Sequence, residues 1–252
     1  TLQLFTLGLV GSALSIAILP TLSRQAASKD LGDYIRTLMN GLKLLLVLII
    51  PATLGLLAIG LPTIRLIFEQ GKFTEADRWL TFFALLGYLP GIPAAAIDQM
   101  LIFSFYARKN TLTPVLVGVV SNLTYLVVAL LSIQVIHTGM MGLVIANSLQ
   151  QVVHMSIMFW LLRRQFGGLG GHGLYRTLLN ATLASVFLMV CAYFGAGLVT
   201  LALGESGKIV NLITVVVGIG AGGLAYLFAL RVLRVNEMNQ VWQAVARKVF
   251  KR

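Results

Sequence analysis

Apolar stretches long enough to cross a lipid bilayer constrain this chain more than any other feature of its sequence. About 18 mostly apolar residues are enough for a helix to cross the hydrocarbon core. We therefore predict seven spans joined by short polar connections. They lie approximately at 2–19, 38–60, 79–106, 113–136, 139–162, 175–203 and 209–233. The sequence thus predicts an all-α fold, a polytopic membrane helical bundle.

Composition supports a membrane protein and excludes several other classes. Hydrophobic residues make up 58% of the 252 residues and charged residues 11%, whereas a soluble domain carries roughly 25% charged residues. This hydrophobicity excludes intrinsic disorder. A single cysteine can form neither an intrachain disulfide nor a cysteine-based metal cluster. The chain opens directly inside an apolar stretch, from which we expect that an N-terminal half precedes it.

Positively charged residues are concentrated in alternate connections. Most of the 19 lysines and arginines lie in the first, third and fifth connections and after the last span. The positive-inside rule places these connections and the C-terminus in the cytoplasm. Topology thus accounts for most of the net charge of +11 without a nucleic-acid partner. The predicted cytoplasmic-face cations include Arg24, Lys43, Arg108 and Lys109, with Lys43 reaching the headgroups from inside the second span.

Prolines interrupt two of the predicted spans. Pro51 lies in the second span, and Pro90 and Pro93 lie in the third. A proline removes one intrahelical hydrogen bond and bends the helix. Kinked helices often line a moving cavity in transporters, but neighbouring helices can equally accommodate such bends. The sequence leaves both interpretations open.

The last third of the chain differs from the rest. Residues 167–174 are rich in glycine and predict a flexible linker. Two spans follow within 175–234, where Gly218 and Gly222 have the G-x-x-x-G spacing of a small-residue packing face. Residues 235–252 mix apolar and basic residues, and we expect them to form an amphipathic helix on anionic membrane lipids.

Asp98 is the one acidic residue well inside a predicted span, and Gln99 follows it. It precedes Arg108 by about 15 Å at the rise of an α-helix, which is too deep for a simple headgroup contact. An ionised carboxylate near the bilayer centre costs at least about 2.5 kcal/mol, so such residues often mark a transport path. A hydrogen bond to a neighbouring span is the alternative role.

Further polar residues lie on the fourth and fifth spans. Asn122 belongs to the fourth span, and Asn147, Gln150 and His154 share one face of the fifth because residues three, four and seven apart lie on one side of a helix. Together with Asp98 and Gln99, these residues are our candidates for a substrate path that binds a polar headgroup. Hydrogen bonds between helices are the equally weighted alternative.

The sequence indicates neither an enzyme nor a metal site. Its three histidines have no metal-ligand spacing, and it contains no H-E-x-x-H or G-x-S-x-G motif. Two matches to G-x-G-x-x-G, at 168–173 and 218–223, lack the strand and helix that flank a dinucleotide site. We expect no catalytic residue, metal or cofactor.

Three segments resemble one known family. Residues 68–74 (FEQGKFT) and 105–114 (FYARKNTLTP), preceded by 18–24 (ILPTLSR), are similar in order and spacing to the MurJ (MviN) family of lipid II flippases. The resemblance covers approximately residues 2–165. This family belongs to the multidrug/oligosaccharidyl-lipid/polysaccharide exporter superfamily and has fourteen helices.

The resemblance implies that the chain is the C-terminal half of such a flippase in the bacterial cytoplasmic membrane. Residues 1–166 would form the C-terminal lobe of the transporter core, and 175–234 two helices with a groove for a polyprenyl tail. With the missing N-terminal lobe, they would move lipid II, an undecaprenyl-diphosphate-linked muropeptide, to the outer leaflet by alternating access. Small residues would shape the groove: Ala192, Gly195, Gly197, Gly218, Gly220 and Gly222.

Two other functions stay open at this point. A cation-coupled multidrug or polysaccharide-lipid exporter of the same superfamily would also account for the kinks and for Asp98, but it does not predict the segments at 68–74 and 105–114. A membrane scaffold without transport activity is the second alternative. Replacement of Asp98 and the polar face without loss of growth would favour the scaffold.

Overall fold

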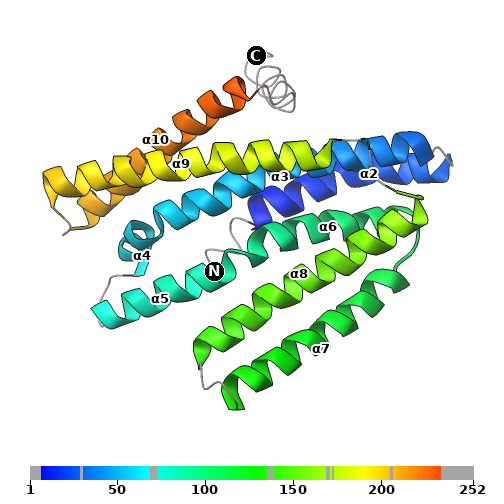
Figure 1. Ribbon diagram of the computed structural model, residues 1–252, viewed down its shortest axis with the longest axis horizontal. Coiled ribbons are helices and arrows are strands. Elements are labelled where there is room, and N and C mark those ends of the chain that lie inside the picture. Colours follow the sequence, from blue (N-terminus) through cyan, green and yellow to red (C-terminus); the bar gives the residue numbers. More distant parts are fainter. Residues whose placement is uncertain are drawn as a thin grey trace.

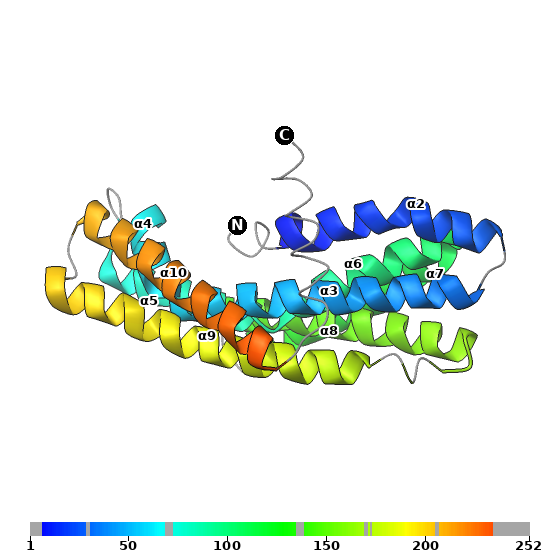
Figure 2. The same ribbon diagram turned by 90° about the horizontal axis from the view of Figure 1, so that it is seen from above.

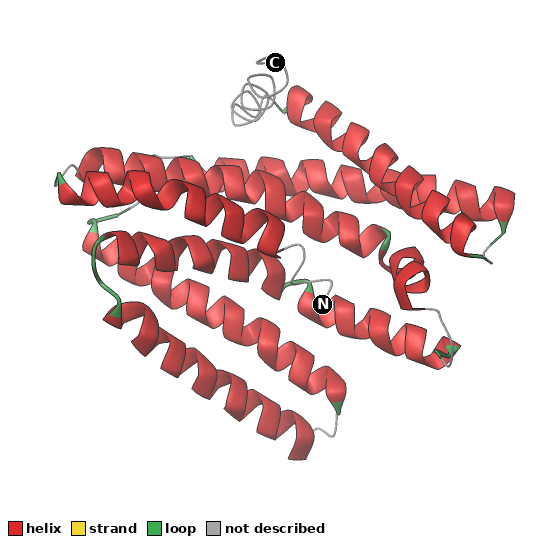
Figure 3. Cartoon of the chain, turned by 180° about the vertical axis from the view of Figure 1, so that it is seen from behind, coloured by secondary structure: helices red, strands yellow, loops and turns green. Residues whose placement is uncertain are grey.

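The computed structural model describes residues 7–28, 31–68, 73–134, 139–168, 171, 173–204 and 207–233, and all regular structure within them is helical (Figures 1 and 3). The elements are η1 (Leu7–Ser12), a π-helical turn, and the α-helices α2 (Ala13–Ala27), α3 (Leu31–Ala58), α4 (Gly60–Phe68), α5 (Glu75–Tyr88), α6 (Gly91–Ala107), α7 (Leu112–Gln134), α8 (Met140–Gln165), α9 (Leu174–Leu203) and α10 (Lys208–Val232). The predicted all-α helical bundle is confirmed.

Most of the predicted spans correspond to single helices. Within the described residues, α3, α7, α8, α9 and α10 are each long and apolar enough to cross a membrane, and α5 with α6 forms a sixth, bent candidate. The first predicted span corresponds to η1 and α2. It continues through Pro20 to Ala27, whereas the sequence predicted its end at residue 19. The packing of α2 against α3 and α6 outweighs the one hydrogen bond that Pro20 removes.

The helices are arranged around α3 and α6. Figures 1 and 2 show α9 and α10 paired along one side of α3, whereas α8 and then α7 lie on the opposite side of the bundle. α6 packs against α2, α3 and α8. The side chains of Tyr34, Leu38, Leu45 and Ile49 on α3 are fully buried. The core of the molecule is therefore centred on α3.

Pro90 accounts for the break between α5 and α6, which are bent by 41°. Pro90 has no N–H with which to continue the helical ladder. Pro93 lies in the first turn of α6, where a missing N–H costs no helical bond. At the break, Gly91 approaches α8 so closely that an added Cβ would lie 2.9 Å from the Oγ of Ser148. The predicted kink is thus a break that packs closely against α8.

Pro51 lies inside α3 without ending the helix. Because Pro51 has no N–H, the carbonyl of Val47, four residues earlier, loses its helical donor. Tyr226 of α10 replaces that donor: its hydroxyl donates to the Val47 carbonyl over 2.6 Å. Both residues are buried. This hydrogen bond therefore ties α10 to α3 where the α3 ladder is incomplete.

The predicted small-residue face of α10 is confirmed. An added Cβ on Gly222 would lie 3.0 Å from the Cβ of Ala192, and one on Gly218 would lie 2.7 Å from Cγ2 of Ile59. By contrast, an added Cβ on Gly220 would meet no atom within 4 Å. Gly218 and Gly222 therefore allow α10 to approach its neighbours closely, which is how helices in lipid gain packing energy.

We expect the substitution Tyr226→Phe to lower the stability of the full-length protein, because the buried Val47 carbonyl would lose its donor. Leaving a buried acceptor unpaired costs about 1–3 kcal/mol. Unfolding in detergent measures the effect. Tyr193→Phe is the matched control, because Tyr193 is 65% exposed. Equal unfolding free energies for the two variants would contradict this role of Tyr226.

Candidate functional site

A groove with a volume of about 760 Å³ lies between α3, α4, α9 and α10. Helices far apart in the sequence form it, because α9 packs along α3 and α10 packs against α4. Its lining residues come from all four helices: Pro51, Ala52, Gly55, Leu56, Ile59, Thr63, Ile67, Phe68, Leu188, Ala192, Val215, Gly218, Ile219, Gly222 and Gly223. We call this cavity the apolar groove.

The apolar groove has almost no polar chemistry. Thr63 is the one lining residue with a polar side chain, and its hydroxyl donates to the carbonyl of Ile59 over 2.7 Å. No unpaired side-chain donor is therefore presented to a ligand by the lining residues. Apolar cavities of this kind stay dry and accept apolar molecules. The geometry suits a hydrocarbon chain rather than a headgroup.

Three of the small residues predicted to shape a groove line the cavity, namely Ala192, Gly218 and Gly222. Gly195 instead packs against α10, where an added Cβ would lie 3.0 Å from the Cβ of Ala221. Gly197 and Gly220 have no neighbouring atom within 4 Å of an added Cβ. The small residues thus divide between the groove, the α9–α10 contact and open surface.

A second feature is a buried polar pair between α6 and α8. The Nδ1 atom of His154 lies 2.6 Å from Oδ1 of Asp98, and the two residues are 8% and 6% exposed. Burial of a charge requires a partner of this kind. In this conformation Asp98 therefore contacts a neighbouring span, which was the alternative role weighed from the sequence.

Gln99 points away from Asp98, although the two are neighbours in sequence. The side-chain amide of Gln99 donates to Oγ of Ser12 in η1 over 2.9 Å. An added Cβ on Gly11 would lie 3.3 Å from Oε1 of Gln99, so the absence of a side chain there gives Gln99 its space. Asp98 thus joins α6 to α8, and Gln99 joins α6 to η1.

The predicted polar face of α8 is divided between two partners. Gln150 donates to Oδ1 of Asn122 on α7 over 2.6 Å, whereas His154 contacts α6. Asn147 is half-buried. The structure thus pairs two of the predicted path residues across the α7–α8 contact and buries a third.

Three of the four predicted cytoplasmic-face cations lie at or just beyond the ends of α2 and α6, whereas Lys43 lies well inside α3. Arg24, Arg108 and Lys109 are exposed, and Figure 1 shows the C-terminal ends of α2, α6 and α8 at one end of the bundle. The guanidinium of Arg108 donates to Gln165 over 2.6 Å. An added Cβ on Gly173, just before α9, would lie 3.7 Å from Nζ of Lys43.

One polar contact near the break was missed by sequence analysis. The hydroxyl of Ser148 donates to the carbonyl of Gly87 over 2.6 Å, which joins α8 to the end of α5. Gly87 and Gly91 flank Leu89–Pro90 at the four-residue spacing of a small-residue packing face. That spacing was the available signal for a close helix contact at the break.

Together these features define a class: a multi-pass helical membrane protein with a broken span and an apolar groove within its bundle. Comparison with known proteins gives the particular family. The chain belongs to the family described as "Lipid II flippase MurJ", whose pattern matches residues 1–218. The resemblance inferred from the sequence is thus confirmed.

Individual relatives agree with this assignment. A Vibrio cholerae protein named "Probable lipid II flippase MurJ" is 31% identical over 155 residues, which cover 62% of this chain and 29% of that protein. A Bdellovibrio bacteriovorus protein of the same name is 26% identical over 237 residues, or 93% of this chain and 44% of that protein. The chain therefore spans less than half the length of these curated relatives.

The fold also matches a solved structure, "Lipid II flippase MurJ, inward closed conformation". The TM-score is 0.68 at 22% sequence identity, and the match covers 91% of this chain and 45% of that chain. At this identity the likeness establishes a shared fold. The arrangement of helices described above is therefore that of part of a larger known architecture.

We expect Asp98→Ala to destabilise the full-length protein more than Asp98→Asn. The alanine variant leaves Nδ1 of His154 buried without a partner, at a cost of about 1–3 kcal/mol, whereas the asparagine amide can still donate to it. Thermal unfolding in detergent measures both. If the two variants unfold at the same temperature, the hydrogen bond between Asp98 and His154 does not stabilise the fold.

Proposed function

We propose that this chain is the C-terminal half of a transporter that moves lipid II from the inner to the outer leaflet of the bacterial cytoplasmic membrane. The observation that carries the proposal is the family match over residues 1–218. The apolar groove supports the lipid part of the substrate independently of that match. The family assignment favours a transporter over an enzyme.

In this proposal, different parts of the protein bind the apolar tail and the charged headgroup of the substrate. The apolar groove would hold part of the polyprenyl tail, because an apolar chain gains by filling a cavity whose lining residues offer it no hydrogen-bonding side chain. The diphosphate headgroup requires cationic donors, for which arginine is best suited. We expect those donors chiefly in the N-terminal lobe, which would complete the central cavity with residues 1–166.

The proposed orientation follows the positive charges. The connections at the end of the bundle that carries Arg24, Arg108 and Lys109 would face the cytoplasm, where anionic lipids attract basic residues. The C-terminus would lie on the same side. The predicted amphipathic helix at 235–252 lies outside the described residues, so this part of the proposal rests on sequence alone.

Alternating access requires a part of the bundle that can change shape. The break at Leu89–Pro90 is the best candidate, because broken helices provide movable segments in transporters. The exposed Asn122–Gln150 pair is available to a headgroup on the surface of α7 and α8. In this conformation Asp98 and His154 contact one another, so exposure of this pair would require a rearrangement.

One observation favours a second function. A buried carboxylate paired with histidine inside the bundle is also what a cation-coupled exporter of drugs or polysaccharide lipids needs. Such an exporter would transport a hydrophobic drug in response to an imposed ion gradient. Identification of the transported substrate, lipid II or a hydrophobic drug, distinguishes the two functions.

Complementation tests the proposed function directly. The full-length protein that contains this chain is produced in a bacterium depleted of its own lipid II flippase, and growth and outward exposure of lipid II are scored. We expect rescue of both. Failure of a well-expressed protein, in a host shown to accept a close relative of this protein, would favour the exporter.

We expect Gly223→Phe to reduce lipid II exposure in the same assay, because the new ring would occupy the apolar groove. Gly223 lines the groove, and an added Cβ there would meet no atom within 4 Å, so folding should be preserved. The matched control is Gly220→Phe, three residues earlier on α10. Gly220 has equal space but does not line the groove. Equal lipid II exposure in the two variants would argue against binding of the tail there.

A further inference from the structure

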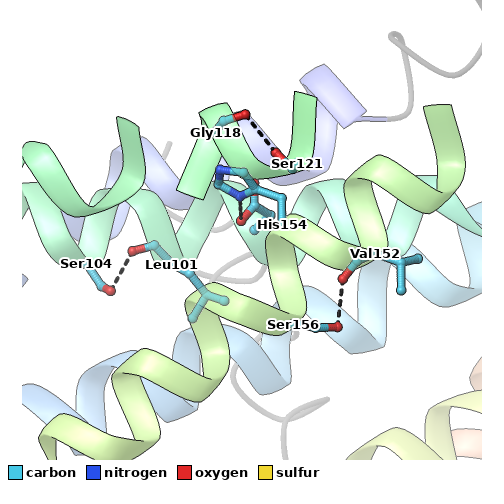
Figure 4. A network of polar contacts seen from close by, with 8 residues as sticks. Leu101, Ser104, Gly118, Ser121, Val152, His154 and Ser156 are labelled. Atoms are coloured by element: carbon cyan, nitrogen blue, oxygen red, sulfur yellow. Dashed lines mark hydrogen bonds and ion pairs between the residues drawn. The ribbon is translucent and has the colours of Figure 1, made fainter. Parts of the chain in front are cut away.

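His154 connects three helices rather than two. Its Nδ1 atom lies 2.6 Å from the Asp98 carboxylate on α6, and its ring also makes a hydrogen bond to the backbone of Pro114 in the first turn of α7. Since proline has no N–H, the Pro114 carbonyl is the acceptor. Figure 4 shows the imidazole of His154 directed at the segment of α7 that contains Gly118 and Ser121.

Gly118 makes this contact with α7 possible. An added Cβ on Gly118 would lie 3.8 Å from Nε2 of His154, so Nε2 is the ring nitrogen that faces α7. A larger side chain at this position would extend toward the imidazole. The two nitrogens of His154 thus face two acceptors on different helices: a carboxylate on α6 and a carbonyl on α7.

Two acceptors around one imidazole determine how many protons the site must hold. Both hydrogen bonds form when His154 carries protons on Nδ1 and Nε2 and Asp98 is ionised. They also form when Asp98 is protonated and donates to Nδ1 while His154 keeps its Nε2 proton. The two arrangements contain the same two protons and have no net charge. The complete set of contacts therefore requires two protons on the pair.

Loss of one proton changes the contacts of a single helix. If the Nε2 proton leaves for bulk water, Nδ1–H still donates to ionised Asp98, and the pair has a net charge of −1. The Nε2 lone pair then faces the Pro114 carbonyl, and two acceptors without a hydrogen between them repel each other. The hydrogen bond between α6 and α8 survives, whereas the hydrogen bond from His154 to Pro114 in the first turn of α7 is lost. The Gln150–Asn122 hydrogen bond further along α7 and α8 contains no titratable group and stays.

Within the described residues, Asp98 and His154 are the only ionisable groups that act on one another at this site. No other ionisable group on the described helices packed around them acts on either residue; Tyr34, for example, donates to the Ser104 carbonyl. The other ionisable groups on those helices are Arg24 on α2; Asp33, Tyr34, Arg36 and Lys43 on α3; Glu75, Asp77, Arg78 and Tyr88 on α5; Tyr106 on α6; Tyr125 on α7; and Arg163 and Arg164 on α8.

We propose that Asp98 and His154 form a proton-binding site, and that release of one proton detaches α8 from the first turn of α7. Histidine suits this role because its charge changes near physiological pH. A proton that is bound in one arrangement of the helices and released in the other shifts the balance between them. As the coupling site of a lipid II transporter, the pair rests on the proposed function; as a proton site, it does not.

Spin-label distances test the proton site without any substrate. In the full-length protein with its native cysteines replaced, labels are attached through Leu116→Cys on α7 and Phe187→Cys on α9, which are exposed positions on opposite sides of the bundle (Figure 1). We expect the distance distribution to shift reversibly as the pH is raised, because the first turn of α7, next to Leu116, separates from α8. A distribution that does not change with pH would overturn the proposal.

The variant Asp98→Asn tests whether the pH-dependent shift comes from this site or from other titrating groups. The asparagine amide donates to Nδ1, so His154 keeps its Nε2 proton and its contact with Pro114. We expect the pH-dependent shift to disappear in this variant, whereas Ser148→Ala, which removes a hydrogen bond of α8 that involves no titratable group, should retain it. If Asp98→Asn does not fold, His154→Gln takes its place. A shift that persists in the tested variant would overturn the proposal.

Transport provides the second readout and separates the two proposals. In vesicles with lipid II and an imposed pH gradient, we expect the rate of lipid II movement to depend on the gradient for the wild type and not for Asp98→Asn. If lipid II is not moved but the label distance follows pH as expected, the proton site stands and the flippase function fails. If lipid II is moved without dependence on the gradient, the coupling role of the site is wrong.

Discussion

Helices in lipid gain nothing from burying apolar faces against one another, because the surrounding hydrocarbon is equally apolar. The structure of this chain depends on that constraint. Its helices are held by close approach at small residues, such as Gly218 and Gly222 of α10, and by a few interhelical hydrogen bonds. Each of those bonds therefore has a large influence on which helices become neighbours.

The two internal prolines show how such bonds decide local shape. Pro51 and Pro90 each remove a backbone donor, but the results differ. The carbonyl exposed by Pro51 receives the hydroxyl of Tyr226, and α3 continues as one helix across the core. At Pro90 the chain breaks into α5 and α6, where Gly87 and Gly91 allow α8 to approach. The hydrogen bond from α10 thus keeps α3 continuous at Pro51, whereas the span at Pro90 is divided into two helices.

The same packing creates the features proposed for function. The close contact of α9 with α10 and α3 leaves an apolar groove beside α4, whose lining has few polar groups and suits a hydrocarbon chain. On the other side of the bundle, α8 contacts α6 and α7 through His154. A substrate with an apolar tail and a charged headgroup needs both kinds of environment. A site that binds a proton between three helices would link the second environment to movement.

The sequence alone determined the class of this protein: its long apolar stretches require membrane-spanning helices, its basic residues lie in alternate connections, and three segments resemble the MurJ family. It also indicated the break at Pro90. It could not determine which neighbour each polar residue meets. Asp98 and Gln99 are adjacent in the chain but about 100° apart around the helix, so one meets α8 and the other η1. The sequence also could not show that the short helix α4 lines the apolar groove. Contacts between segments far apart in the chain depend on how the helices pack, and the packing is decided only when all of the helices are assembled.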